Sequence, residues 1–314
     1  MNDINYQNTI QNLVSDKFEG KKELAGKFAL RYPISMEREM RRIARAYVKI
    51  IRDELKAALP ELIKSYTKNV SLRADNSLYV RADGYNNLRE ELNKALEKIK
   101  NKIEMKEKSF NIRRLVENAA KGVEKLSISE WRRICNSTLG LDILEDYFSG
   151  EFFEQLLNGW TETNVNLIKT VKDDLLNDLE QTVLGSFYAG ESSAVLKMKI
   201  QKEYNSSKNH AGMIARDQIA KLNSQLARQQ MEDAGCSKYI WSASGDKRVR
   251  DCHREFDGQT FSFNDPPEGW YMTKSKGKVY TGRRCNPGED ICCRCVAIPV
   301  FDLESLVIPV NCNH

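Results

Sequence analysis

The residues of this chain that could do chemistry gather between Tyr239 and Pro299. Five of the eight cysteines lie there, together with His253, one of three histidines. The five are Cys252, Cys285, Cys292, Cys293 and Cys295. Thiolate sulfur and imidazole nitrogen are ligands that zinc prefers, and both groups also serve as nucleophile and base in catalysis. This stretch could therefore bind a metal ion, hold a reactive thiol, or pack its cysteines as small core residues.

The metal-site hypothesis depends on spacing. Cys293 and Cys295 are two residues apart, so on a strand both side chains would leave the same face. With Cys285 and either His253 or Cys252 they offer four sulfur or nitrogen ligands, as a structural zinc ion requires. The Cys-x-Cys spacing is, however, tighter than the Cys-x₂₋₄-Cys of structural zinc sites. We expect Cys293 and Cys295 to be structural core residues, with structural zinc as the alternative.

A catalytic site is the third interpretation. His253, a cysteine and Asp246 could act as base, nucleophile and orienting carboxylate. The sequence has no nucleophile elbow, no thiol-protease signature and no glycine-rich phosphate loop. We therefore predict that the protein is not an enzyme. A thiol- and histidine-dependent hydrolase, or a toxin-like enzyme domain in the C-terminal part, is the alternative function.

Basic residues of the same stretch form two clusters, over residues 247–254 and 274–284, and aromatic residues lie beside the second. Such clusters neutralise phosphates without reading the base sequence. The alternative is a solvated basic face, partly balanced by nearby acidic residues. We predict non-specific contacts with double-stranded DNA through Lys247, Arg250, Arg254, Lys274, Lys276, Lys278, Arg283 and Arg284.

Short strands must position these residues. Tyr239-Ile240-Trp241 is an apolar, strand-forming run, and residues 259–263 alternate polar and apolar. The sequence predicts a sheet and no helix inside 239–299. The expected strands lie near 239–243, 259–263, 278–281 and 295–300. A helix from His210 to Ala234 is expected to pack on this sheet.

The rest of the chain has the apolar spacing of amphipathic helices. Pro60 is expected to end or kink the first helix, and Gly140 to interrupt the third. Residues 194–204 and 210–234 read as two separate helices. The predicted fold class is α+β, with long helices followed by a small mixed domain. The predicted parts are a flexible N-terminal arm over 1–31, a helical domain over 32–207 and a mixed α/β domain over 208–314.

Composition narrows the classes of function. The net charge is +5 over 314 residues, which permits contact with nucleic acid without requiring it. No apolar run is long enough to span a bilayer, so we expect no membrane partner. The first residues lack the basic and apolar regions of a secretory signal, and we therefore expect the cysteines to be made in a reducing cytoplasm.

Two groups of residues indicate a particular protein family more specifically than composition does. The first is the run Trp-Thr-Glu-Thr-Asn-Val-Asn-Leu-Ile-Lys over 160–169. The second is an ordered series after Arg216 that includes Trp241, Asp246, Arg248, His253, Gly258, Pro287-Gly288-Glu289-Asp290 and Cys293-Arg294-Cys295. Together, over roughly residues 32–299, they resemble the phage Mu F-like minor head protein family, also called head morphogenesis proteins. We expect Trp241, Asp246, Arg248, His253, Gly258 and Arg294 to form the structural motif, with Arg248 anchored by Asp246.

The resemblance implies a minor head protein of a bacteriophage or prophage, present in the virion and, during assembly, in the host cytoplasm. It implies docking on the portal protein, with scaffold or major capsid protein as further partners, and a role in handling packaged DNA. The helical part is expected to provide the docking surface. One branch of the family has a Cys-x-x-Cys pair at the positions of Arg250 and His253, where this chain keeps only His253 as a candidate ligand.

Overall fold

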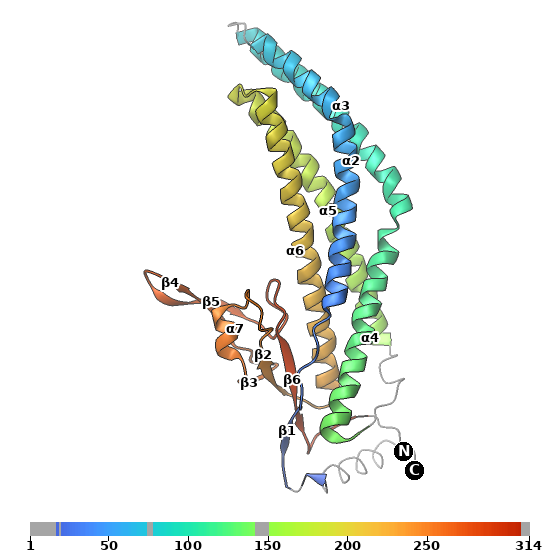
Figure 1. Cartoon of the computed structure of the whole chain (residues 1–314), viewed down its shortest axis with the longest axis vertical. Coiled ribbons are helices and arrows are strands. Elements are labelled where there is room, and N and C mark those ends of the chain that lie inside the picture. Colours follow the sequence, from blue (N-terminus) through green and yellow to red (C-terminus); the bar gives the residue numbers. More distant parts are fainter. Residues whose placement is uncertain (1–16, 19, 74–77, 142–150, 309–314) are drawn as a thin grey trace. The chain divides into compact units, whose positions relative to one another are not determined.

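The structure is a computed structural model that describes residues 17–18, 20–73, 78–141 and 151–308. One short strand precedes the long helices and the other strands follow them, so the fold is α+β, as predicted (Figure 1). The helices are α2 (Ile34–Arg73), α3 (Leu78–Phe110), α4 (Ile112–Leu139), α5 (Glu151–Ala189), α6 (Ser193–Asp233) and α7 (Asp251–Phe256). The strands are β1 (Glu23–Ala25), β2 (Lys238–Ser242), β3 (Thr260–Ser262), β4 (Glu268–Thr273), β5 (Gly277–Arg284) and β6 (Val296–Asp302). No helix in the described ranges is both long and apolar enough to cross a membrane.

Contacts divide the chain into two compact units. Unit 1 comprises Met1–Arg38, Asn118–Trp160 and Arg216–His314, and unit 2 comprises Glu39–Glu117 and Thr161–Ala215. Helices α2, α4, α5 and α6 each have residues in both units. The predicted boundary at residue 207 therefore lies inside α6, whose residues change unit after Ala215.

Unit 2 is helical, and two expected helix ends do not occur in it. Helix α2 continues through Pro60, with Leu55 and Leu62 buried on either side of it. That buried face outweighs the hydrogen bond that proline cannot donate. The predicted separation of 194–204 from 210–234 is also wrong, because α6 is continuous. Its buried stripe, Ile200, Ser207, Ala211 and Ala215, keeps helical spacing through the polar segment.

Unit 1 contains an antiparallel sheet in the order β1-β6-β2-β3. Three of the four predicted strand segments belong to it, and β1 was not predicted. Within the arm predicted over 1–31, Glu23 pairs with Asp302 and Ala25 with Val300. Residues 1–16 and 19 of that arm lie outside the described residues. Behind the sheet, Trp131 of α4 packs on Phe301 of β6, with ring centroids 5.8 Å apart.

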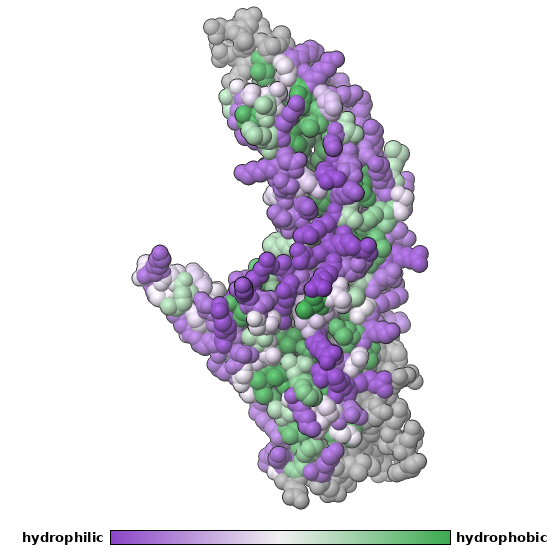
Figure 2. Space-filling model, in the orientation of Figure 1, coloured by the Kyte–Doolittle hydropathy of each residue, from purple (hydrophilic) through white to green (hydrophobic). Residues whose placement is uncertain are grey.

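The fourth predicted segment, 278–281, lies elsewhere. It belongs to a separate hairpin of β4 and β5, in which Trp270 pairs with Tyr280 and Thr273 with Gly277. The hairpin projects from the rest of unit 1 (Figure 1). In Figure 2 it ends in hydrophilic residues, with paler and green residues behind them. The expectation of no helix inside 239–299 is also wrong, because α7 supplies one short turn of helix there.

Candidate functional site

The site lies where the loop between β5 and β6 meets α7 and β2. Helix α6 anchors this loop at two points: Ser224 Oγ donates to the carbonyl of Pro287 at 2.7 Å, and Asp217 Oδ1 accepts from the amide of Cys292 at 2.8 Å. Gly288 permits the first contact, since its φ is +87° and a Cβ there would lie 2.9 Å from that of Ser224. The loop is thus held rigidly enough to aim its side chains.

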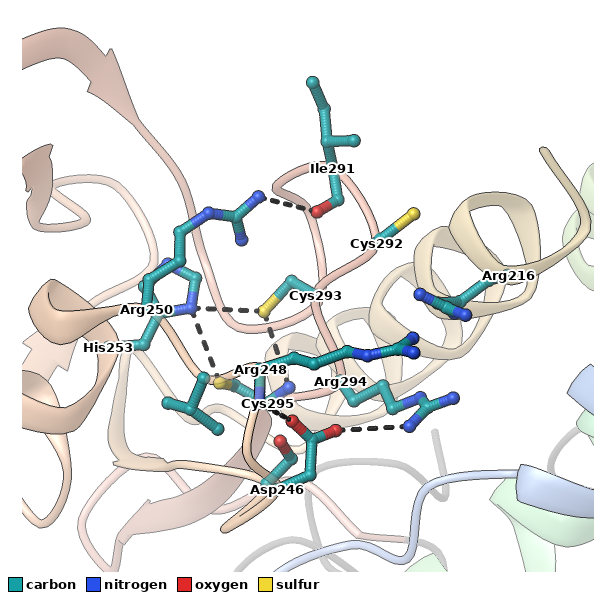
Figure 3. Close-up of a pocket in the computed structure, with 12 residues that line it drawn as sticks. Arg216, Asp246, Arg248, Arg250, His253, Ile291, Cys292, Cys293, Arg294 and Cys295 are labelled. Carbon is teal, nitrogen blue, oxygen red and sulfur yellow. Dashed lines mark hydrogen bonds and ion pairs between the residues drawn. The ribbon is translucent and has the colours of Figure 1, made fainter. Parts of the chain in front are cut away.

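Three buried ligand-type side chains converge in this site (Figure 3). The Nδ1 atom of His253 lies 3.6 Å from Cys293 Sγ and 3.6 Å from Cys295 Sγ. All three ligand atoms lie within 4.8 Å of one another. The exposed fractions of the residues are 4% for His253 and 3% for each cysteine. The cluster is therefore compact and shielded from solvent on most sides.

The imidazole of His253 is held from two further directions. Its ring lies 5.0 Å from the ring of Trp241, which reaches across from β2. Its Nε2 atom faces the carboxylate of Asp290 at 3.9 Å. Asp290 also pairs with Arg250 at 3.3 Å and with Arg283 at 3.8 Å. The ring thus presents Nδ1 to the sulfurs and Nε2 to a carboxylate.

The two thiols influence each other's protonation. The contact with Cys295, followed by burial, raises the pKa of the Cys293 thiol well above its usual value. The contact with Cys293 lowers the pKa of the Cys295 thiol, against the effect of burial. Burial and the contact between the thiols thus move the two pKa values in opposite directions.

A pocket of about 210 Å³ opens beside the cluster. Its lining includes His253 and both thiols together with four arginines, which come from α6, from the turn before α7 and from the loop before β6 (Figure 3). The arginines are Arg216, Arg248, Arg250 and Arg294. Asp246 is the one acidic residue in the lining. The lining of the pocket is therefore predominantly cationic.

Two of these arginines, Arg294 and Arg216, belong to a structural ion-pair network, in which Arg216 Nε lies 3.5 Å from Glu37 Oε1. Arg294 donates to Glu37 through Nε at 2.7 Å and Nη2 at 2.6 Å, and to Asp246 through Nη1 at 3.1 Å. Burial opposes ionisation of Glu37, but the bonds from Arg294 hold its pKa below the usual value. Tyr32 also donates to Glu37, at 3.0 Å. This network ties the first turn of α2 to the cysteine loop.

Sequence reasoning missed the role of Glu37 and misassigned the partner of Arg248. Glu37 lies 257 residues from Arg294, so no local pattern could connect them. The expected Asp246–Arg248 side-chain pair does not form, because Asp246 Oδ1 accepts from the backbone amide of Arg248 at 2.7 Å. The Arg248 side chain is exposed and lines the pocket instead. Of the remaining motif residues, Gly258 has a φ of +76° and donates to the carbonyl of Trp241 at 2.8 Å.

The predicted ligand set is reduced from four residues to three. Cys285 is half-buried and is not part of the cluster, and neither is Cys252, which is buried on α7. Cys292 has a left-handed φ of +55°, and Figure 3 shows its thiol directed away from His253. The tail residues Cys312 and His314 lie outside the described residues.

Five of the eight predicted DNA-contacting residues have acidic partners. Arg250 and Arg283 pair with Asp290, Arg254 with Asp251, Lys278 with Glu255 and Arg284 with Asp265. The other three are Lys247, Lys274 and Lys276, which are exposed and make no ion pair with a described residue. Two of them lie in the turn of the β4–β5 hairpin, which is the most available cationic feature of the predicted surface.

The site lies in the part of the chain that is similar to known proteins. Residues 177–298 match the family described as Phage Mu protein F like protein. An uncharacterized protein of Haemophilus influenzae is 28% identical over 215 residues, which cover 68% of this chain and 45% of that protein. The chain thus spans about half the length of this relative. No solved structure matches the chain. Residues 177–298, which include His253, Cys293 and Cys295, are thus similar to phage Mu F-like proteins, as expected from the sequence.

Proposed function

We propose that this chain is a minor head protein of a bacteriophage or prophage, which assists head morphogenesis by binding rather than by catalysis. The observation that supports this proposal is the match of residues 177–298 to phage Mu protein F-like proteins. The protein would then act in the host cytoplasm during assembly and remain in the virion. The ion-pair network of Glu37 and Arg294, which ties the first turn of α2 to the cysteine loop, is consistent with a structural role in assembly.

The finer part of the proposal is docking on the portal protein. Within unit 2, a groove of about 350 Å³ lies between α2 and α6. Leu55, Leu59, Ile200 and Tyr204 give it an apolar floor, and Arg52, Lys56 and Lys197 give it a cationic rim. Such a groove suits an amphipathic helix with acidic flanks. We assign it to a portal segment of that chemistry, and scaffold or major capsid protein would bind elsewhere.

Co-expression of the full chain with the portal protein of its own phage tests this assignment. The two proteins are expected to copurify, with fewer chains of this protein than of portal subunits. The variant Leu59→Glu places a carboxylate on a half-buried groove position and is expected to abolish copurification. Glu61→Leu, an exposed position on the same helix outside the groove lining, is the control and should copurify normally. Copurification of Leu59→Glu at the wild-type ratio would refute the groove, and failure of the wild type would refute portal docking.

The second part of the proposal is non-specific binding of double-stranded DNA through Lys247, Lys274 and Lys276. These side chains are exposed and have no acidic partner among the described residues, so phosphates would not need to displace a carboxylate. Aromatic side chains behind the hairpin turn, Tyr271 and Tyr280, are exposed as well. The salt dependence of binding measures the contribution of each lysine.

A further inference from the structure

We infer that His253 Nδ1, Cys293 Sγ and Cys295 Sγ form a zinc-binding site whose fourth coordination position opens into the arginine-lined pocket. The inference is independent of the proposed role in the phage head. It is drawn from the convergence of three buried ligand atoms that belong to α7 and to the loop before β6.

The distances between ligand atoms match those around a tetrahedral zinc ion. Bonds of about 2.3 Å to sulfur and about 2.0–2.1 Å to nitrogen, at the tetrahedral angle, place sulfur and nitrogen about 3.6 Å apart. Both Sγ–Nδ1 distances in the site are 3.6 Å. All three atoms lie within 4.8 Å of one another, so they converge closely enough to share one ion.

The surroundings of the histidine also suit a metal ligand. A histidine that binds zinc commonly directs its other ring nitrogen to a carboxylate, which fixes the tautomer and the orientation of the ring. Here Nδ1 faces the two sulfurs, and Nε2 faces Asp290 at 3.9 Å. The 5.0 Å contact with the Trp241 ring fixes the imidazole from the side.

The tight Cys-x-Cys spacing does not argue against the site. Cys293 and Cys295 direct their thiols at the same imidazole, while Arg294 between them reaches Glu37 on the other side. This alternation is that of an extended chain entering a strand. The spacing therefore supplies two ligands on one side and a structural ion pair on the other.

The fourth ligand comes from outside the described side chains. Cys252, Cys285 and Cys292 are not part of the cluster, whereas all three cluster residues line the 210 Å³ pocket. A water molecule or an anion in this pocket completes the tetrahedron, as in zinc sites with three protein ligands. The exposed Arg248 and the partly exposed Arg250 on the pocket wall favour an anion in that position.

Metal analysis of the full chain tests the inference. The protein is purified without a histidine tag or chelator and then equilibrated with zinc and desalted. We expect about one zinc ion per chain. Cys293→Ser, Cys295→Ser and His253→Asn are each expected to lose the ion, whereas the neighbouring Cys292→Ser and Cys285→Ser should retain it. Asp290→Asn is expected to weaken zinc affinity by about tenfold to a hundredfold, through the orientation of His253.

Two measurements on the wild-type protein cover the case in which a ligand variant fails to fold. X-ray absorption at the zinc edge should resolve two sulfur ligands and two nitrogen or oxygen ligands. Cobalt substitution should give the intense visible bands of a tetrahedral ion together with sulfur-to-cobalt charge transfer. A wild-type protein that takes up no metal, a site with other than two sulfurs, a disulfide between Cys293 and Cys295, or loss of zinc from Cys285→Ser or Cys292→Ser would each overturn the inference.

Discussion

The number of unpaired lysines predicts how steeply the affinity for DNA falls as the salt concentration rises. Each phosphate neutralised on duplex DNA contributes a slope of about −0.9 to log K against log salt concentration. Three unpaired lysines, Lys247, Lys274 and Lys276, therefore predict a slope of about −2.7 for the wild-type chain. Between about 50 and 200 mM salt, that slope corresponds to a loss of affinity of about fortyfold.

The perturbation is the double variant Lys274→Ala/Lys276→Ala. It should reduce the slope to about −0.9 and the loss of affinity over the same salt range to about fourfold, because one contact remains. Stability should not change, since both side chains are exposed and unpaired. The bond from the backbone amide of Lys276 to Thr273 Oγ1, at 3.0 Å, does not involve the side chain.

The assay is fluorescence anisotropy of a labelled duplex at a series of salt concentrations, with the full chain. A fragment over 208–314 is unsuitable, because it would lack β1 and Trp131, which complete the sheet and its core. Lys22→Ala/Lys238→Ala is the matched control: it removes the same charge from unit 1, but at lysines paired with Glu304 and Glu23. A wild-type slope near zero would refute DNA binding. Equal loss of slope in both variants would show that net charge, and not the hairpin, determines affinity.

Two further predictions concern stability and are checked by urea denaturation. Glu37→Gln breaks the buried pair with Arg294 and should lower the free energy of unfolding by about 3 kcal/mol at neutral pH. The folded pKa of Glu37 lies below its usual value, so the stability that Glu37 contributes is present at neutral pH and is lost as pH falls through the folded pKa. The wild type should therefore lose more stability than Glu37→Gln on acidification. Parallel pH profiles of the two proteins would contradict this. Gly288→Ala should lower the free energy of unfolding by more than about 1 kcal/mol. A Cβ at this position would lie 2.9 Å from Ser224, and the positive φ would add backbone strain. Gly245→Ala is the control, because Gly245 also has a positive φ but a Cβ there would have no atom within 4 Å. An equal loss of stability in both variants would show that the contact with Ser224 contributes nothing.

Several features of the fold could be predicted because they are local. The apolar run at Tyr239 and the alternation at 259–263 indicate strands by themselves, and helical spacing identifies the long helices. The three-residue strand β1 has no pattern of its own, since it exists only through pairing with β6. The segment 278–281 is a strand as predicted, but the sequence does not indicate which strand it pairs with, and it pairs with β4.

The types of residue in the site could be predicted from the sequence, but which cysteines belong to the site could not. Spacing identified Cys293 and Cys295 as neighbours on one face, and the scarcity of histidine singled out His253. Spacing could not exclude Cys285, because the direction of a thiol depends on the turn that carries it. Likewise, counting basic residues could not reveal that Asp290 neutralises Arg250 and Arg283, since these pairs form only in the folded loop.

The position of β6 has a consequence for the order of synthesis. In the sheet β1-β6-β2-β3, the strand between β1 and β2 is the last of the four to leave the ribosome. Until residues 296–302 emerge, β1 and β2 each have an open edge, and open strand edges are templates for pairing between chains. Both segments of unit 2, by contrast, are complete once Ala215 has been made. The nascent chain therefore passes through an interval in which its helices can pack while its sheet is still incomplete, and that interval is when it is most vulnerable to aggregation.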